Sequence, residues 1–126
     1  MRDRGRAAVL AEKGFELHEG DLLRPETLEG AGRDIGVAYY LVHMMGGNRE
    51  GDFTEQEERA ARTFTDLALE EGIGRVIYLG GLGDAPTSKH LRSRHHTAQI
   101  LEASGPPLTY FRAAMVVGAR SESYRT

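Results

Sequence analysis

Short apolar runs alternate along this chain with longer segments whose apolar residues recur at helical spacing, and this alternation constrains the fold most. The apolar runs lie at residues 35–42, 75–79 and 108–117, and residues 15–19 alternate apolar and polar residues as a further short strand. Strands that alternate with helices pair parallel to one another through right-handed crossovers. The run at 35–42 is almost continuously apolar, which is typical of a parallel strand covered on both faces. The sequence therefore predicts an α/β fold with a parallel sheet flanked by helices.

Capping residues predict where the helices begin. Asp3 precedes a first helix, and Ser88 precedes a last one. Asp52 with Glu55 three residues later forms a predicted capping box, which would open the longest helix. Pro25 is placed to open a single helical turn, since proline is favoured at the first helical position.

Glycines predict where the helices end. Gly14 closes a helix over residues 4–13, Gly72 closes the second helix, and Gly105 with two following prolines closes the third. One apolar stripe lies within each helix. The stripes consist of Ala7, Ala8, Leu10 and Ala11, then Phe53, Ala60, Phe64, Leu67 and Ala68, then Leu91, His95, Ala98 and Leu101.

Composition limits the classes of protein that the chain resembles. Its 126 residues suffice for one domain with a modest core, so we expect residues 1–126 to form a single domain. The net charge of −3 gives no electrostatic reason to expect a nucleic acid or an anionic membrane as partner. No apolar stretch approaches the ~20 residues of a membrane span. The absence of cysteine excludes disulfides and thiolate chemistry, and it fits a cytoplasmic protein.

Four segments follow the predicted strands, at the carboxyl edge where parallel sheets bind ligands. They are residues 20–22, 43–47, 80–83 and 112–114, and the middle two are rich in glycine. Glycine lets a backbone approach a ligand closely. Connections between strands and helices are often glycine-rich without any ligand, so spacing alone leaves both interpretations open.

Five sequence stretches together resemble the NmrA-like group of atypical short-chain dehydrogenases/reductases. This resemblance implies a Rossmann fold that binds NADP or NAD, and an activity related to that of oxidoreductases. The stretches are Glu19-Gly20-Asp21-Leu22, Val37-Ala38-Tyr39-Tyr40-Leu41-Val42-His43, Arg75-Val76-Ile77-Tyr78-Leu79-Gly80-Gly81-Leu82, His90-Leu91-Arg92-Ser93-Arg94-His95 and Leu108-Thr109-Tyr110-Phe111-Arg112-Ala113-Ala114.

The resemblance also implies a set of cofactor-binding residues at that edge. Asp21 and Leu22 would contact the adenine end, and Arg2 would bind the 2′-phosphate of NADP through its guanidinium. A charge at the chain terminus that contacts no ligand is the alternative for Arg2. The set consists of Arg2, Asp21, Leu22, Val42, His43, Met44, Gly80, Gly81 and Ala113, with residues 42–44 along the ribose and nicotinamide.

Several family features have no counterpart here. No glycine-rich phosphate loop precedes the first predicted helix, and the first two strands of the family are missing. The resemblance thus implies an incomplete NAD(P)-binding domain over residues 1–126, truncated at both ends. His90 and Arg94 occupy the positions of the catalytic tyrosine and lysine, and Gly80-Gly81 replace the serine. Because arginine is no titrating proton relay, the catalytic residues stay unassigned.

Two classes of function remain open after this comparison. One is an NAD(P)-dependent oxidoreductase-like domain that binds its cofactor when the missing N-terminal part is present. The other is a non-catalytic regulatory or interaction protein that has lost cofactor binding. No metal site is expected, because the histidines lack carboxylates at ligand spacing.

Loss of the first two family strands also leaves the run at 35–42 without a neighbour on one side. Such a chain would rearrange, pair with a second copy or be unstable. We expect a homo-oligomer through this exposed strand edge.

Overall fold

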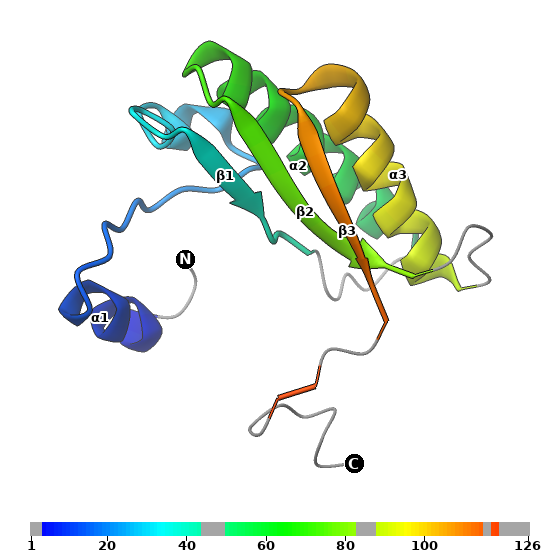
Figure 1. Cartoon of the computed structure of the whole chain (residues 1–126), viewed down its shortest axis with the longest axis horizontal. Helices are drawn as coiled ribbons and strands as arrows, with labels where there is room; N and C mark the ends of the chain where they lie inside the picture. The colour runs from blue at the N-terminus through cyan, green and yellow to red at the C-terminus, as the bar shows by residue number, and fades with distance from the viewer. Residues whose placement is uncertain (1–3, 44–49, 83–87, 115–116, 119–126) are drawn as a thin grey trace.

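The computed structural model describes residues 4–43, 50–82, 88–114 and 117–118, and its centre is a three-stranded parallel sheet. The strands are β1 (Val37–Tyr40), β2 (Arg75–Gly81) and β3 (Leu108–Ala113), in the spatial order β1-β2-β3. Both neighbouring pairs run parallel, as Figure 1 shows. The predicted α/β class and parallel sheet are confirmed.

The helical elements are α1 (Arg4–Glu12), the 3-10 turn η1 (Pro25–Leu28), α2 (Glu50–Glu70) and α3 (Lys89–Ser104). Helices α2 and α3 connect the strands and cover one face of the sheet. Helices α2 and α3 lie side by side behind the strands in Figure 1. No helix in the described part of the chain is long and apolar enough to cross a bilayer.

The predicted helix ends at Gly14 and Gly72 are confirmed. Their φ angles are +84° and +76°, a left-handed conformation that glycine adopts without steric cost. After α2, the Ile73 amide donates to the Ala68 carbonyl at 2.9 Å, which satisfies an otherwise unpaired group at the helix end. The end of α2 therefore has the geometry that its sequence predicts.

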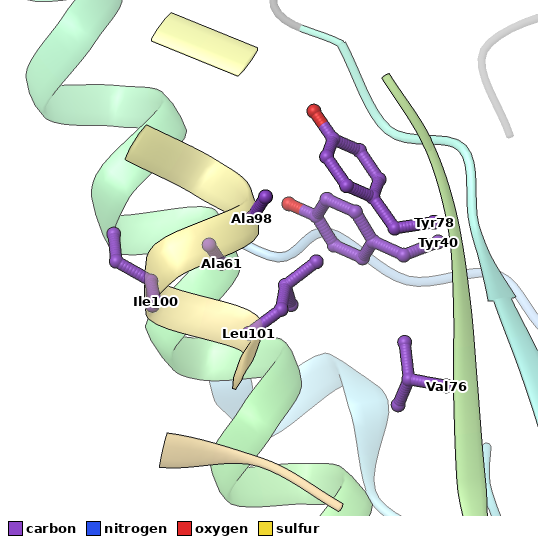
Figure 2. Packing of buried hydrophobic residues seen from close by; sticks show 7 residues of the cluster. All are labelled: Tyr40, Ala61, Val76, Tyr78, Ala98, Ile100 and Leu101. Carbon is purple, nitrogen blue, oxygen red and sulfur yellow. The ribbon is translucent and has the colours of Figure 1, made fainter. Parts of the chain in front are cut away.

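The core lies between the sheet and the two long helices. Figure 2 shows two tyrosine rings that extend from the strands toward small side chains on the helices. The small residues on α2 and α3 let the helices approach the rings closely, and aromatic side chains fill the remaining space. The core cluster consists of Tyr40, Ala61, Val76, Tyr78, Ala98, Ile100 and Leu101.

A carboxylate at the end of α2 fixes the loop that leads into β1. The Gly30 amide donates to Glu71 Oε1 at 2.5 Å, and the Gly32 amide donates to Glu71 Oε2. Two amide donors on one carboxylate satisfy groups that would otherwise be partly buried and unpaired. This clamp holds the amino end of β1 against the helical layer.

The predicted strand at 15–19 is wrong. These residues belong to no strand, and residues 15–20 make no backbone hydrogen bond with β1. Helix α1 and this segment lie apart from the sheet in Figure 1. A strand exists only through hydrogen bonds to a neighbour, and this segment forms none with the three described strands.

Two further predictions are corrected. Helix α2 begins at Glu50, so Asp52 lies inside the helix and does not precede it as a cap. The run at 35–42 yields only the strand Val37–Tyr40, and its outer face is uncovered, with Tyr39 67% exposed. Both long helices pack on the opposite face, which contains the buried Tyr40.

Candidate cofactor site at the carboxyl edge of the sheet

The carboxyl ends of the three strands meet at one edge, because the strands are parallel and in register. Gly80 and Gly81 of β2 align with Arg112 and Ala113 of β3. The Leu82 amide continues this pairing by donating to the Ala113 carbonyl at 3.1 Å. Val42 and His43 follow the end of β1 at the same edge. The structure therefore brings five of the predicted contact residues to this edge, namely Val42, His43, Gly80, Gly81 and Ala113.

Asp21 and Leu22 have local roles in the turn before η1. Asp21 Oδ1 accepts a hydrogen bond from the Leu23 amide at 2.9 Å, and the Asp21 amide donates to Thr27 Oγ1 at 2.8 Å. This arrangement is an Asx-turn, in which the side chain replaces a backbone acceptor. Leu22 is half-buried against the core cluster, while the Asp21 side chain stays exposed. Arg2 and Met44 lie outside the described residues.

The two glycines at the end of β2 are needed for packing. A Cβ atom built on Gly80 would lie 2.6 Å from the Tyr110 hydroxyl oxygen, and one on Gly81 would overlap the Leu91 side chain. Both glycines are buried. The space that a longer side chain would need is therefore taken by residues of this chain, and this accounts for both glycines without a ligand.

A polar cluster lies beside this edge, and its buried carboxylate, Glu57, is not among the site residues predicted from the sequence. Glu57 of α2 and Ser93 of α3 are only 8% and 7% exposed, and the Ser93 hydroxyl donates to Glu57 Oε2. His43 Nδ1 lies 4.0 Å from Glu57 Oε1. The apolar stripe of α2 contained the available signal, because Glu57 stands three residues before Ala60 on the same helical face.

Arg94 and Glu57 lie beside opposite nitrogens of the His43 ring. Arg94 Nη2 lies 3.2 Å from His43 Nε2. A guanidinium only donates hydrogen bonds, so His43 Nε2 is the acceptor in this contact. His43 Nδ1 faces Glu57 Oε1 at 4.0 Å. An arginine and a carboxylate therefore orient the imidazole ring.

Three tyrosines line the inner side of the strands near this cluster. The Tyr78 ring stacks on Tyr110 with centroids 5.4 Å apart and meets Tyr40 edge-on at 5.9 Å. Burial raises the pKa of Tyr78 to about 12, against an opposing effect of Arg94. Burial also raises the pKa of Tyr40, with smaller contributions from Tyr78 and Glu57. The hydroxyls are therefore neutral near pH 7, and Tyr78 donates to the Arg94 carbonyl at 3.3 Å.

The two residues that the sequence resemblance aligned with a catalytic tyrosine and lysine, His90 and Arg94, lie on α3. Arg94 is half-buried and engaged with His43, and His90 occupies the first turn of the helix. A partly buried guanidinium that contacts an imidazole orients its neighbours but transfers no proton. Within the described residues, no group of three or more metal-ligating side chains comes together.

Comparisons with known proteins give a likeness in structure alone. No protein-family model and no curated protein sequence matches the chain. It is similar to the Citrobacter sp. triphenylmethane reductase complexed with NADP(H), with a TM-score of 0.71 and 19% identity. That match covers 92% of this chain and 39% of the reductase.

Two other solved structures show the same fold. A dTDP-glucose 4,6-dehydratase from Streptomyces venezuelae with NAD and DAU bound has a TM-score of 0.57 and 18% identity, over 74% of this chain and 36% of that one. A nucleoside-diphosphate-sugar epimerase from Staphylococcus aureus has a TM-score of 0.59 and 16% identity, over 75% and 33%. The chain spans well under half the length of each of these proteins. Its described residues have the Rossmann-type α/β fold that this reductase, dehydratase and epimerase share.

Proposed function

We propose that the chain is an NAD(P)-binding domain of the NmrA-like, atypical short-chain dehydrogenase/reductase type, related to oxidoreductases. One observation carries this proposal. The parallel strands bring residues 42–43, 80–81 and 113 to the carboxyl edge of the sheet, in a fold shared with a reductase complexed with NADP(H). Ligands of open α/β sheets bind at this edge.

The described residues fit the rim of a dinucleotide but not its centre. The exposed Asp21 carboxylate would face the adenine end, and His43 would face the ribose and nicotinamide. Arg2 and Met44 belong to the same proposed site. NADP or NAD would supply hydride chemistry when bound. The described residues include no glycine-rich loop and helix N-terminus of the kind that usually binds the diphosphate of such a cofactor. The space beside Gly80 and Gly81 is filled by the side chains of Tyr110 and Leu91.

A second candidate function is non-catalytic binding, as a regulatory or interaction protein. Arg94 replaces a titrating lysine, and its guanidinium contacts His43. The raised pKa of Tyr78, about 12, makes that phenol a poor proton donor near pH 7. Arg94 and Tyr78 therefore favour a site that binds a ligand without catalysis over a site that transfers protons.

Cofactor titration separates the two candidates. We expect the 126-residue chain to bind NADPH with a dissociation constant well above micromolar, because diphosphate contacts are missing. The measurement is NADPH fluorescence, with His43→Ala as the weakening variant and His96→Ala as the control. His96 is exposed and pairs with Glu58 on the helical layer, so its removal leaves the strand edge intact.

The outcomes of this titration differ clearly. Weak, saturable binding that His43→Ala lowers and His96→Ala does not supports the cofactor site. Tight stoichiometric binding would show that another segment, such as residues 80–83, holds the diphosphate. A complete lack of saturation at millimolar NADPH would favour the non-catalytic candidate.

Two further features complete the proposal. We assign the chain to the cytoplasm, since it contains no cysteine and needs no oxidising compartment. A second copy of the chain is a proposed partner, because β1 pairs with β2 only and its other edge is open among the described residues.

A further inference from the structure

Arg94 is a half-buried guanidinium at the carboxyl edge, and no carboxylate among the described residues pairs with it. The ion pairs of the described chain involve Glu57 and Glu58, and none of them includes Arg94. Arg94 Nη2 instead lies 3.2 Å from His43 Nε2. An imidazole nitrogen accepts this hydrogen bond without balancing the charge of the guanidinium. The positive charge of Arg94 is therefore available to an anion at this edge.

A second guanidinium lies at the same edge. Arg112 of β3 is exposed and aligns with Gly80 of β2. Burial raises the pKa of the Tyr110 hydroxyl, and Arg112 and Arg94 both oppose this rise. The two cations thus act on one phenol, although they come from a strand and a helix. Positive charge is therefore concentrated at the edge where α/β sheets bind ligands.

Glu57, the carboxylate of the polar cluster, is engaged on the other side of His43. It is only 8% exposed, and its Oε2 accepts the Ser93 hydroxyl. Its Oε1 faces His43 Nδ1, whereas Arg94 faces His43 Nε2. Glu57 therefore orients the imidazole and does not pair with the guanidinium.

We propose that Arg94 and His43 form a binding site for an oxyanion, a phosphate or carboxylate group, and that Arg112 strengthens it. The fork of an arginine binds both kinds of group through charge-assisted hydrogen bonds. This inference rests on the proposed function, because it names the chemical class of ligand at the same edge of the sheet. Two sources have this chemistry, namely the phosphates of the dinucleotide and the anionic group of a substrate.

The charge of His43 controls the strength of this site. While Nε2 accepts from Arg94, this hydrogen bond competes with the anion for the guanidinium. A protonated imidazole donates at both nitrogens and cannot accept, so the contact with Arg94 is lost. Both side chains then present N–H groups and positive charge to the anion. Because histidine ordinarily titrates near about pH 6.5, we expect binding to strengthen as the pH falls through that range.

The other titratable and charged groups around the pair come from both long helices and all three strands. Glu57 favours the protonated ring, because it faces Nδ1. Burial raises the pKa of the neighbouring phenols, so they stay neutral in this range. His95 contacts the Tyr110 hydroxyl and is a second histidine, so the test needs a variant of it. The groups are Glu57, His95, Arg112, Tyr40, Tyr78 and Tyr110.

Sulfate is the probe for the site, because it keeps its double negative charge throughout this pH range. The imidazole NMR signals of His43 report binding, with chloride at equal ionic strength as the salt control. We expect Arg94→Gln to weaken sulfate binding roughly tenfold, because it removes charged donors. Arg62→Gln is the matched control, since Arg62 is exposed and pairs with Glu58. Sulfate that shifts His43 no more than chloride does, or equal weakening by both variants, overturns the proposal.

The pH profile separates this role from a purely structural one. Sulfate affinity should rise at least about fivefold from about pH 8 to about pH 5.5, because His43 gains its proton in this interval. His43→Gln should flatten the profile, and His95→Gln should retain it. A profile that stays flat in the natural chain, or that His95→Gln alone flattens, contradicts the proposal.

Two measurements guard against a variant that fails to fold. Circular dichroism checks each protein, and Arg94→Lys replaces Arg94→Gln if the latter unfolds. Lysine keeps the charge and loses the fork, so sulfate binding should weaken while the rise at low pH persists. The titration of the natural chain needs no variant, and its failure alone overturns the proposal.

NADPH distinguishes the two sources of the anion. Competition between NADPH and sulfate assigns the site to a phosphate of the cofactor, and simultaneous binding assigns it to the anionic group of a substrate. Each result supports an oxyanion site. Sulfate binding is measured without cofactor, so its failure is distinguishable from a failure of the NADPH titration.

Discussion

Glu57 is a charged residue type at a core position, and its surroundings explain how the fold tolerates it. The side chain is buried between α2 and α3, where an unpaired carboxylate would be costly. The Ser93 hydroxyl donates to it, and His43 presents its Nδ1 side to the other oxygen. The cluster therefore joins both helices to the chain that follows β1.

Removal of the Ser93 hydroxyl tests this account. We expect Ser93→Ala to lower the free energy of unfolding by about 1–3 kcal/mol, since a buried acceptor loses its donor. Urea denaturation measures the change, with the exposed Ser104→Ala on the same helix as control. In a Glu57→Gln background the effect of Ser93→Ala should shrink. Equal losses in both backgrounds would show that the serine acts independently of the carboxylate.

The buried phenols predict a loss of stability in alkali. The folded-state pKa of Tyr78 is raised from 10.0 to about 12 by burial, so the unfolded chain releases this proton first. Stability from this group is complete below pH 10 and is lost as the pH rises through about 12. Chemical denaturation across that range should show the decline. Tyr78→Phe should make it shallower, and an unchanged slope would assign the decline to other groups.

At the level of elements, the helices follow their local sequence more closely than the strands do. Ser88 caps α3 as predicted, and its Oγ accepts from the Leu91 amide at 3.2 Å. Capping, glycine ends and the apolar stripe all depend on residues within one or two turns. A strand depends on a neighbour that is distant in the sequence, and this is why residues 15–19 form none.

The cap of α3 gives a prediction for an element. Ser88→Ala should destabilise the chain by about 1 kcal/mol, because the first turn loses an acceptor for its amides. Ser88→Asp should retain most of the stability, since aspartate is an equally good cap. Thermal denaturation monitored by the helical circular dichroism signal measures both. Equal losses for the two variants would argue against a capping role.

At the scale of the whole molecule, the described helices cover one face of the sheet, and no other described segment covers the opposite face. Helices α2 and α3 bury the inner residues, while the outer face presents Val37, Tyr39, Leu79 and Phe111 to solvent. An exposed apolar area of this kind is uncommon on monomeric proteins.

The open face predicts binding of a hydrophobic dye. An anilinonaphthalene sulfonate dye should fluoresce with the folded chain, because exposed apolar surface binds it. Phe111→Lys should lower this fluorescence while the helical signal stays unchanged, since Phe111 is exposed and outside the core cluster. The exposed Glu102→Lys on α3 serves as the charge-matched control. Equal fluorescence of all three proteins would place the dye elsewhere.

The sequence by itself determined the α/β class, the helix ends at Gly14 and Gly72, the cap at Ser88 and the position of residues 42–43, 80–82 and 112–114 at the carboxyl edge, whereas residues 20–22 follow no strand. These features follow from backbone conformation and short-range periodicity, which neighbouring residues specify. Only the tertiary structure decided that residues 15–19 stay unpaired, that β1 is bare on one face and that Glu57 meets Ser93 across two helices. Strand pairing and the burial of a charged side chain depend on contacts between residues that are far apart in the sequence. The local sequence around each residue does not specify which distant residue it will meet.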